Sequence, residues 1–291
     1  MSKRLGVFVL FGCMLAAHVA HAEPDRGHFK PAHAAGKVPL PQVRSHIALI
    51  FDEQTQQPLL NKNGGLVAPI ASITKLMTAM VVLDAQLPMD EVVSVTEDDS
   101  GTRKRARSKL SIGMTFSRSE LLMMALMASE NRAALALAKS YPGGTAAAVA
   151  AMNAKARELG MYNTRFYDPT GLSRENVSTA HDLVKMVAAA RNYSVIQQYS
   201  TAAALSVDDT GGRALRFSNT NPLVKSASWE IGVSKTGFIS EAGRCLVMEA
   251  KINQRPVIIV LLNSWGKRTR IGDANRIRRW MESIYASEHR A

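Results

Sequence analysis

Apolar residues near the start of the chain are spaced as they are in strands. Residues 46–51 form a short, mostly apolar run, and Leu59 and Leu60 form a second run after the polar segment 52–58. Two short apolar runs on either side of a turn-forming segment are typical of a β-hairpin. We therefore expect the folded part of the chain to begin with a pair of strands.

The middle of the chain is instead patterned for helices. Apolar side chains between residues 72 and 86 would surround a helix almost completely, which predicts a helix buried inside the domain. Ser117 and Glu120 have the spacing of a capping box ahead of the apolar run 121–127. A further helix is expected over residues 145–159, before a glycine that suits a helix C-terminus.

Beyond Ala204 the apolar residues alternate with polar ones, and this pattern predicts strands. The expected strands are 205–207, 215–217, 231–237, 244–252 and 257–262. A last helix is expected over residues 270–285, with an apolar face made by Ile277, Trp280, Met281 and Ile284. Strands near both ends with helices between them predict an α+β fold. N- and C-terminal segments would build one antiparallel sheet with flanking helices and an all-helical insert.

The first 22 residues have the pattern of a signal peptide. Lys3 and Arg4 precede a mainly apolar stretch, and Ala20-His21-Ala22 fits the A-x-A cleavage pattern. The apolar stretch is too short for a permanent membrane span. Cys13 lies too early and too near a bulky residue to be a convincing lipoprotein acceptor. Residues 23–42 contain four prolines and lack periodicity, so a linker is expected there. The catalytic domain would span residues 43–291.

The net charge of the chain indicates which classes of molecule it would attract. The chain has 36 Lys and Arg against 24 Asp and Glu, a formal net charge of +12. Loss of Lys3 and Arg4 with the signal peptide would leave 34 against 24, or +10. An exported protein of this charge is attracted to anionic polymers such as cell-wall material. No nucleic-acid motif accompanies the charge, and no nucleic-acid partner, cofactor or metal is expected. Cys245 would remain alone, so no disulfide is expected.

The helix over residues 72–86 opens with a candidate nucleophile and base. Ser72 and Lys75 are three residues apart, so their side chains would share one helix face. Backbone N–H groups at a helix start are also free to stabilise an oxyanion. The same S-x-x-K spacing recurs at Ser264 and Lys267. The spacing alone is therefore weak evidence, and motifs further along the chain must separate the two pairs.

Two further motifs come after Ser72 in the chain but do not come after Ser264. They are Ser129-Glu130-Asn131 and Lys235-Thr236-Gly237, and such a trio occurs in β-lactamases and penicillin-binding proteins. Lys75 can accept the serine proton if burial and a second cation, for which Lys235 is the candidate, destabilise its ammonium form. Ser129 and Asn131 could relay the proton to a leaving amine and hold the substrate amide. Lys235 and Thr236 suit a substrate carboxylate, and Gly237 permits close approach of a substrate strand.

Residues 40–285 resemble the low-molecular-weight penicillin-binding proteins, which are serine D,D-peptidases acting on peptidoglycan. The most specific matches are residues 71–84, 129–134, 141–144, 163–166 and 169–172. The resemblance implies a β-lactamase/transpeptidase-like fold in which Ser72 is acylated, Lys75 accepts its proton and Ser129 is the catalytic partner serine. It further implies that Lys235 binds the substrate carboxylate and that the amides of Ser72 and Phe238 form the oxyanion hole. β-Lactams would be covalent inhibitors.

Within this family the chain looks most like the D-alanyl-D-alanine endopeptidase type. It has S-E-N at residues 129–131 in place of the S-G-N common in carboxypeptidases. The chain also ends too soon after Lys235 for the extra β-domain and amphipathic anchor of many carboxypeptidases. We therefore expect a periplasmic enzyme without a stable membrane anchor that cuts D-alanyl cross-links in peptidoglycan. A D-alanyl-D-alanine carboxypeptidase of the same fold is the alternative.

Two other functions remain as rivals. A class A β-lactamase commonly carries its deacylating glutamate in an E-x-x-x-N motif, whereas Glu175 and Asn176 are adjacent here. A non-catalytic, basic wall-binding protein is disfavoured because no motif residue is missing. His181, at the start of an amphipathic helix, is expected to be a surface or capping residue.

Overall fold

The computed structural model describes residues 38–97, 108–209 and 211–288. The predicted signal peptide lies outside the described residues, as does most of the predicted linker. The described part of the chain thus begins at residue 38 and contains almost all of the predicted catalytic domain.

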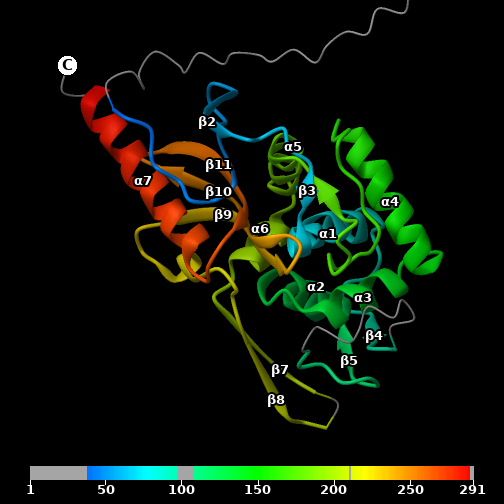
Figure 1. The fold of residues 1–291 in the computed structure, drawn as a ribbon. Coiled ribbons are helices and arrows are strands. Elements are labelled where there is room, and N and C mark those ends of the chain that lie inside the picture. The colour runs from blue at the N-terminus through cyan, green and yellow to red at the C-terminus, as the bar shows by residue number, and fades with distance from the viewer. Residues whose placement is uncertain (1–37, 98–107, 210, 289–291) are drawn as a thin grey trace, which may run out of the picture. The chain divides into compact units, whose positions relative to one another are not determined.

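A five-stranded antiparallel sheet joins the two ends of this part of the chain (Figure 1). Its order is β2-β1-β11-β10-β9. The strands are β1 (Ile47–Asp52), β2 (Gln57–Lys62), β9 (Glu230–Ile239), β10 (Gly243–Ile252) and β11 (Arg255–Ser264). Because Ile47 of β1 lies opposite Leu262 of β11, N- and C-terminal segments are neighbours in one sheet. The predicted α+β arrangement and the predicted first hairpin are confirmed.

Helices fill the middle of the chain, as predicted. They are α1 (Thr74–Asp84), α2 (Arg118–Met127), α3 (Asn131–Lys139), α4 (Gly144–Glu158), α5 (Ala180–Ala190), α6 (Ser194–Thr201) and, after the sheet strands, α7 (Thr269–Glu288). Short strands pair beside them: β3 (Ala68–Pro69) with β6 (Val177–Ser178), and β4 (Val92–Ser94) with β5 (Thr115–Ser117). The hairpin of β7 (Ala204–Asp208) and β8 (Ala214–Ser218) extends away from the central sheet (Figure 1). At the start of α2, Ser117 and Glu120 form the predicted capping box.

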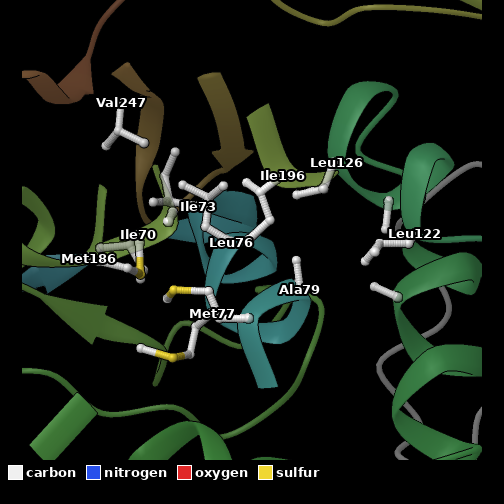
Figure 2. Packing of buried hydrophobic residues seen from close by; sticks show 14 of the residues in the cluster. Ile70, Ile73, Leu76, Met77, Ala79, Leu122, Leu126, Met186, Ile196 and Val247 are labelled. Atoms are coloured by element: carbon white, nitrogen blue, oxygen red, sulfur yellow. The ribbon is translucent and has the colours of Figure 1, made fainter. Parts of the chain in front are cut away.

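Helix α1 is the centre of the larger core. Ile73, Leu76, Met77 and Met80 are fully buried and belong to a cluster that includes Val247 of the sheet. Figure 2 shows this packing, with side chains from α2, α5 and α6 around the helix. Burial of apolar side chains stabilises the folded state, and α1 has apolar side chains almost all round, so burial on nearly every side stabilises it. The predicted burial is therefore confirmed, and the start of α1 is held rigidly.

Helix α7 covers the opposite face of the sheet. Its predicted apolar face is buried against alternate residues of the strands. The members from α7 are Ile277, Trp280, Met281 and Ile284. Residues Leu246 and Met248 of β10 face this helix, whereas Cys245 and Val247 face the larger core. Because side chains alternate between the two faces of a strand, β10 contributes to both hydrophobic cores. Cys245 is a free, buried thiol.

None of the described helices is both long enough and apolar enough to cross a membrane.

Candidate active site

Ser72 lies in a 3₁₀ turn (Ala71–Ile73) that leads directly into α1. The sequence predicted a helix from residue 72, so the predicted helix begins two residues too early. The cause is a close contact that only the folded chain contains: Ala71 has a positive φ of 48°, and the turn packs against Gly171. A Cβ at Gly171 would overlap the carbonyl oxygen of Ala71. The turn that carries the serine is consequently held against the segment around Gly171, which is distant in sequence.

Lys75 points back from the first turn of α1 toward Ser72. Its Nζ lies 3.0 Å from Ser72 Oγ, 2.7 Å from Asn131 Oδ1 and 2.6 Å from the Thr170 carbonyl oxygen. Only 1% of the lysine is exposed. This burial lowers the pKa of Lys75 from 10.5 to about 7, although the charges of Asp168 and Glu130 act in the opposite direction. The predicted pair is brought together, and its amine is partly neutral at physiological pH.

The Thr170 carbonyl is presented by a tightly bonded loop. Asp168 Oδ1 accepts hydrogen bonds from the amides of Thr170 and Gly171, at 2.6 and 2.8 Å. Asn176, which is fully buried, donates to Thr74 Oγ1 at 3.0 Å and to the Asp168 carbonyl at 2.8 Å. The sequence marked residues 169–172 only as a match to the family. Its contact with Lys75 was not predicted, because a backbone carbonyl carries no side-chain signal.

Ser129, between α2 and α3, and Asn131, the first residue of α3, line the same cavity as Ser72. Ser129 has a positive φ of 60°, which is uncommon for a serine and indicates a backbone held by its surroundings. Glu130 points elsewhere: its carboxylate accepts hydrogen bonds from Ser108 Oγ at 2.5 Å and from the Arg132 amide at 3.3 Å. The central residue of the S-x-N motif therefore caps α3 and leaves the two outer residues at the cavity.

Strand β9 contributes the K-T-G motif at the edge of the sheet. Gly237 packs so closely on the serine turn that a Cβ there would lie 3.0 Å from the Ser72 amide nitrogen. Thr236 lines the cavity and donates to Thr220 Oγ1 at 2.7 Å. Lys235 is buried behind this wall, where its Nζ donates to the Thr236 carbonyl at 3.0 Å. Burial lowers the pKa of Lys235 well below 10.5, and the charges of Lys75 and Arg270 lower it further.

The cavity has a volume of about 370 Å³ and contains two arginines that the sequence did not single out. Its lining residues are Ser72, Ser129, Asn131, Thr220, Thr236, Gly237, Phe238, Arg244 and Arg270. Arg270, at the start of α7, is only 8% exposed. Its Nε and Nη1 atoms are buried and have no hydrogen-bond partner. Burial lowers the pKa of Arg270, and the charge of Arg244 adds to this effect. No local motif marks either arginine, because each reaches the cavity through the sheet topology.

Four other residues considered from the sequence do not line this cavity. Ser264 is buried and bonded to Ser45 Oγ at 2.7 Å, while Lys267 is exposed, so the second S-x-x-K pair is not a second site. Glu175 is exposed and contacts Arg174. His181, in the first turn of α5, is half-buried, and its Nε2 lies 3.2 Å from Asn61 Nδ2. Among the described residues no cluster of His, Cys, Asp and Glu is suited to hold a metal ion.

An antiparallel sheet flanked by helices, with a serine at the start of a buried helix and a lysine one turn later, defines the class of acyl-serine hydrolases with the β-lactamase/transpeptidase fold. The model of the peptidase S11 family, described as D-alanyl-D-alanine carboxypeptidase, matches residues 33–266. The chain belongs to this family, which confirms the resemblance found in its sequence.

Individual proteins support the same assignment. A D-alanyl-D-alanine endopeptidase of Pseudomonas aeruginosa is 49% identical over 284 residues, which cover 97% of this chain and 89% of the relative. The crystal structure of the Streptomyces K15 DD-transpeptidase is similar with a TM-score of 0.77 and 28% identity, covering 86% of this chain and 100% of that chain. Penicillin-binding protein D2 from Listeria monocytogenes, in its cefotaxime-bound form, is similar with a TM-score of 0.73 and 27% identity over 85% of this chain and 99% of that chain.

Proposed function

We propose that this protein is a periplasmic serine D,D-endopeptidase that cleaves D-alanyl cross-links in peptidoglycan through an acyl-enzyme. The observation that carries the proposal is the buried Lys75 amine 3.0 Å from Ser72 Oγ, with its pKa lowered to about 7. The endopeptidase from Pseudomonas aeruginosa, at 49% identity, supports the substrate class. The signal-like first 22 residues support export.

The contacts of Lys75 suit a neutral amine that acts as a base. A neutral amine has two N–H donors and one lone pair. The donors match Asn131 Oδ1 and the Thr170 carbonyl, which leaves the lone pair to accept the Ser72 hydroxyl proton. Ser72 Oγ then bonds to the substrate carbonyl carbon as its proton moves to Lys75. The Ser72 and Phe238 amides would stabilise the resulting oxyanion.

We assign to Ser129 the transfer of a proton to the leaving amine. When the substrate C–N bond breaks, the departing amine needs a proton, and Lys75 now holds one. The hydroxyl of Ser129, which lines the cavity, can pass that proton on while Asn131 holds the substrate amide. Water then attacks the ester carbonyl as one of its protons passes to neutral Lys75; the acyl C–Oγ bond breaks, Lys75 returns that proton to Ser72 Oγ, and the acid product leaves. Every proton transfer in this scheme uses groups of this chain.

Arg270 and Thr236 suit the carboxylate of the substrate. Two guanidinium nitrogens of Arg270 lack a partner, and an arginine fork fits a carboxylate in two-point contact. Lys235, next to Thr236 in β9, is almost completely buried; direct contact between Lys235 and substrate stays a prediction. A cavity with this charge also suits a terminal D-alanine, so D-alanyl-D-alanine carboxypeptidase activity is the second candidate. The family description supports it.

The test compares an insoluble and a soluble substrate. Purified sacculi and a soluble pentapeptide are incubated with the protein, and cross-linked dimers and free D-alanine are measured by chromatography. An endopeptidase removes dimers from sacculi. Release of D-alanine with no loss of dimers would leave a carboxypeptidase.

β-Lactams are the expected covalent inhibitors, because they present an acylating carbonyl beside a carboxylate. The cefotaxime-bound relative supports this expectation. A fluorescent penicillin therefore reports acylation of the purified protein directly. A non-catalytic wall-binding protein would remain unlabelled.

A further inference from the structure

The turn between β11 and α7, which leads into the cavity-lining Arg270, presents an exposed tryptophan. Trp265 is 81% exposed, whereas the other two tryptophans, Trp229 and Trp280, are 8% and 5% exposed. Burying an indole normally contributes to stability, so the fold gains little from this one. The proposed catalytic steps do not use it either.

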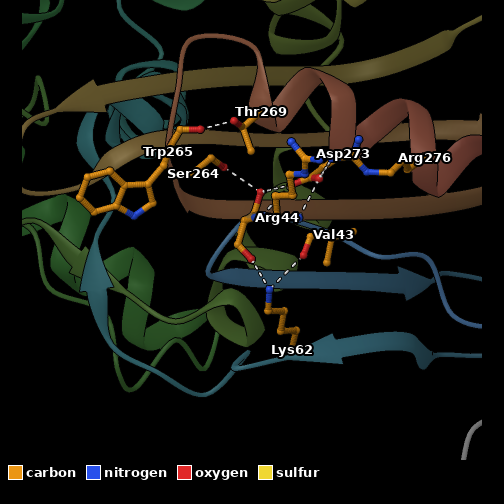
Figure 3. A network of polar contacts seen from close by, with 9 residues as sticks. Val43, Arg44, Lys62, Ser264, Trp265, Thr269, Asp273 and Arg276 are labelled. Carbon is orange, nitrogen blue, oxygen red and sulfur yellow. Dashed lines mark hydrogen bonds and ion pairs between the residues drawn. The ribbon is translucent and has the colours of Figure 1, made fainter.

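A buried polar network fixes the backbone of this turn (Figure 3). Ser264 Oγ lies 2.7 Å from Ser45 Oγ, and Ser45 donates to the fully buried Asp273 at 2.5 Å. Thr269 Oγ1 donates to the Trp265 carbonyl oxygen. In Figure 3 the indole points away from this network. The tryptophan is thus carried by a backbone held on both sides, and binding a ligand would cost little ordering of the turn.

The position of the turn follows from the strand register. Arg244 lies opposite Phe238 on β9 and opposite Ser264 on β11, so the three residues form a row across the sheet. Arg244 also stacks on the half-exposed ring of Phe238, 4.5 Å from its centroid. Neighbouring strands are about 4.8 Å apart. Trp265 is the next residue along the chain after Ser264, so it lies just past the end of β11 and beside this row, whose first two members line the cavity.

The residues around the indole indicate which class of ligand it would bind. Lys267 and Arg268 are exposed on the same turn, and the cavity-lining Arg270 follows them. A single flat aromatic ring suits one sugar ring, and the adjacent cations suit an anionic polymer. Insertion into lipid calls for a broader apolar face than one indole between a buried serine and two cations. A polysaccharide that carries acidic peptides has both properties.

We propose that Trp265 forms a saccharide-binding subsite, in which the indole stacks on a sugar ring of the glycan strand while the attached peptide occupies the cavity. This inference rests on the proposed function, since it extends the same site toward a polymeric substrate. The subsite would favour peptides attached to glycan over free peptides.

The first test measures binding without catalysis. A tetramer of β-1,4-linked N-acetylglucosamine, which contains no peptide bond for the enzyme to cut, is titrated against intrinsic tryptophan fluorescence. Because Trp229 and Trp280 are buried, the response belongs to Trp265. We expect a saturable change in the wild type, a loss of that change in Trp265→Phe, and a wild-type response in Tyr162→Ala. Tyr162 is the matched control, since it is 82% exposed and does not line the cavity.

The second test measures turnover. Aromatic contacts of this kind correspond to about a three- to tenfold change, so Trp265→Ala should digest sacculi about three to ten times more slowly. Hydrolysis of a soluble pentapeptide and labelling by penicillin should stay within twofold of wild type, and Trp265→Phe should recover part of the loss. The thermal midpoint should not change, because the side chain is exposed.

Several outcomes would overturn the proposal. One is wild-type digestion of sacculi by Trp265→Ala together with no fluorescence response to the tetramer. Another is binding of the wild type, but not of Trp265→Ala, to vesicles of anionic phospholipid in the absence of tetramer binding, which would assign the turn to a membrane surface. If the wild type binds the tetramer but cleaves no cross-links, the proposed function fails and the saccharide subsite stands.

Discussion

Lys75 Nζ lies 3.0 Å from Ser72 Oγ in a site where the lysine is almost completely buried. The two residues are one helical turn apart, but their contact depends on elements far along the chain. Asn131 and the Thr170 carbonyl orient the amine, and Gly171 and Gly237 pack against the serine turn. The pair therefore works only in the folded domain, and substitutions can test each contribution separately.

The first prediction concerns the acylated residue. Ser72→Ala should abolish labelling by fluorescent penicillin, because the variant has no oxygen nucleophile at the start of α1. Ser264→Ala is the matched control, since Ser264 belongs to the other S-x-x-K pair and is buried in a structural network. It should retain labelling. Labelled Ser72→Ala protein would show that acylation occurs elsewhere.

The second prediction concerns the protonation state of Lys75. Acylation needs the neutral amine, and burial lowers the pKa of Lys75 to about 7. The second-order rate constant for acylation should therefore fall as pH decreases through about 7, and this group should not reduce the rate at higher pH. Stopped-flow or gel-based labelling at several pH values measures the profile. A rate independent of pH between about 5.5 and 8.5 would exclude Lys75 as the base, given that about 90% protonation is reached one unit below a pKa.

A variant separates the charge of Lys75 from its basicity. Lys75→Arg keeps a positive charge but cannot lose its proton near neutrality. We expect it to lose acylation while retaining a cooperative thermal transition. Activity in a folded Lys75→Arg protein would contradict the assignment independently of the pH profile.

The third prediction concerns Arg270. Removing a charge-assisted partner of a carboxylate in a desolvated site costs about 2–5 kcal/mol, so Arg270→Ala should lower kcat/KM by about 30-fold or more. Arg270→Lys should restore only part of the lost kcat/KM, since an ammonium cannot make the two-point contact. Arg279→Ala, at an exposed position of the same helix, is the control. Equal kcat/KM values for Arg270→Ala and wild type would remove this arginine from carboxylate binding.

The fourth prediction concerns the packing of Gly171. Gly171→Ala introduces a Cβ that overlaps the Ala71 carbonyl oxygen at a positive φ of 80°. Overpacking of this kind costs about 1–3 kcal/mol, and the displaced serine turn should also lower the acylation rate. Gly212→Ala separates the two causes, because Gly212 has a similar φ of 74° but nothing within 4 Å of the added atom. Equal losses of stability in both variants, measured by chemical denaturation, would leave no role for the contact.

The fifth prediction concerns the basic charge of the protein. If long-range attraction holds the enzyme on an anionic polymer, digestion of sacculi should slow as salt rises, because exposed charges are screened over about 10 Å at 0.1 M. Hydrolysis of a small soluble peptide should respond less. Digestion of sacculi that is indifferent to salt would remove the electrostatic contribution and leave the catalytic assignment intact.

The sequence by itself determined the order of the elements and the reactive pair. Residues 72–86 are apolar all round, and this pattern predicted the buried helix α1 because the period of a helix is a local property. Alternation beyond Ala204 predicted strands β9, β10 and β11 for the same reason. The three motifs, taken in order, distinguished Ser72 from Ser264.

Only the tertiary structure decided which other groups surround that pair. The Thr170 carbonyl reaches Lys75 across 95 residues of sequence, and a carbonyl oxygen is present in every residue. Arg244 and Arg270 reach the cavity through the register of β9, β10 and β11 and through the turn into α7. The sequence predicts that Lys235 binds the substrate carboxylate, and this stays a prediction; only the structure shows that its Nζ is buried and donates to the Thr236 carbonyl. Local patterns fix which element a residue belongs to, but packing between elements fixes which side chains are buried, which are neutral and which, like Trp265, remain exposed.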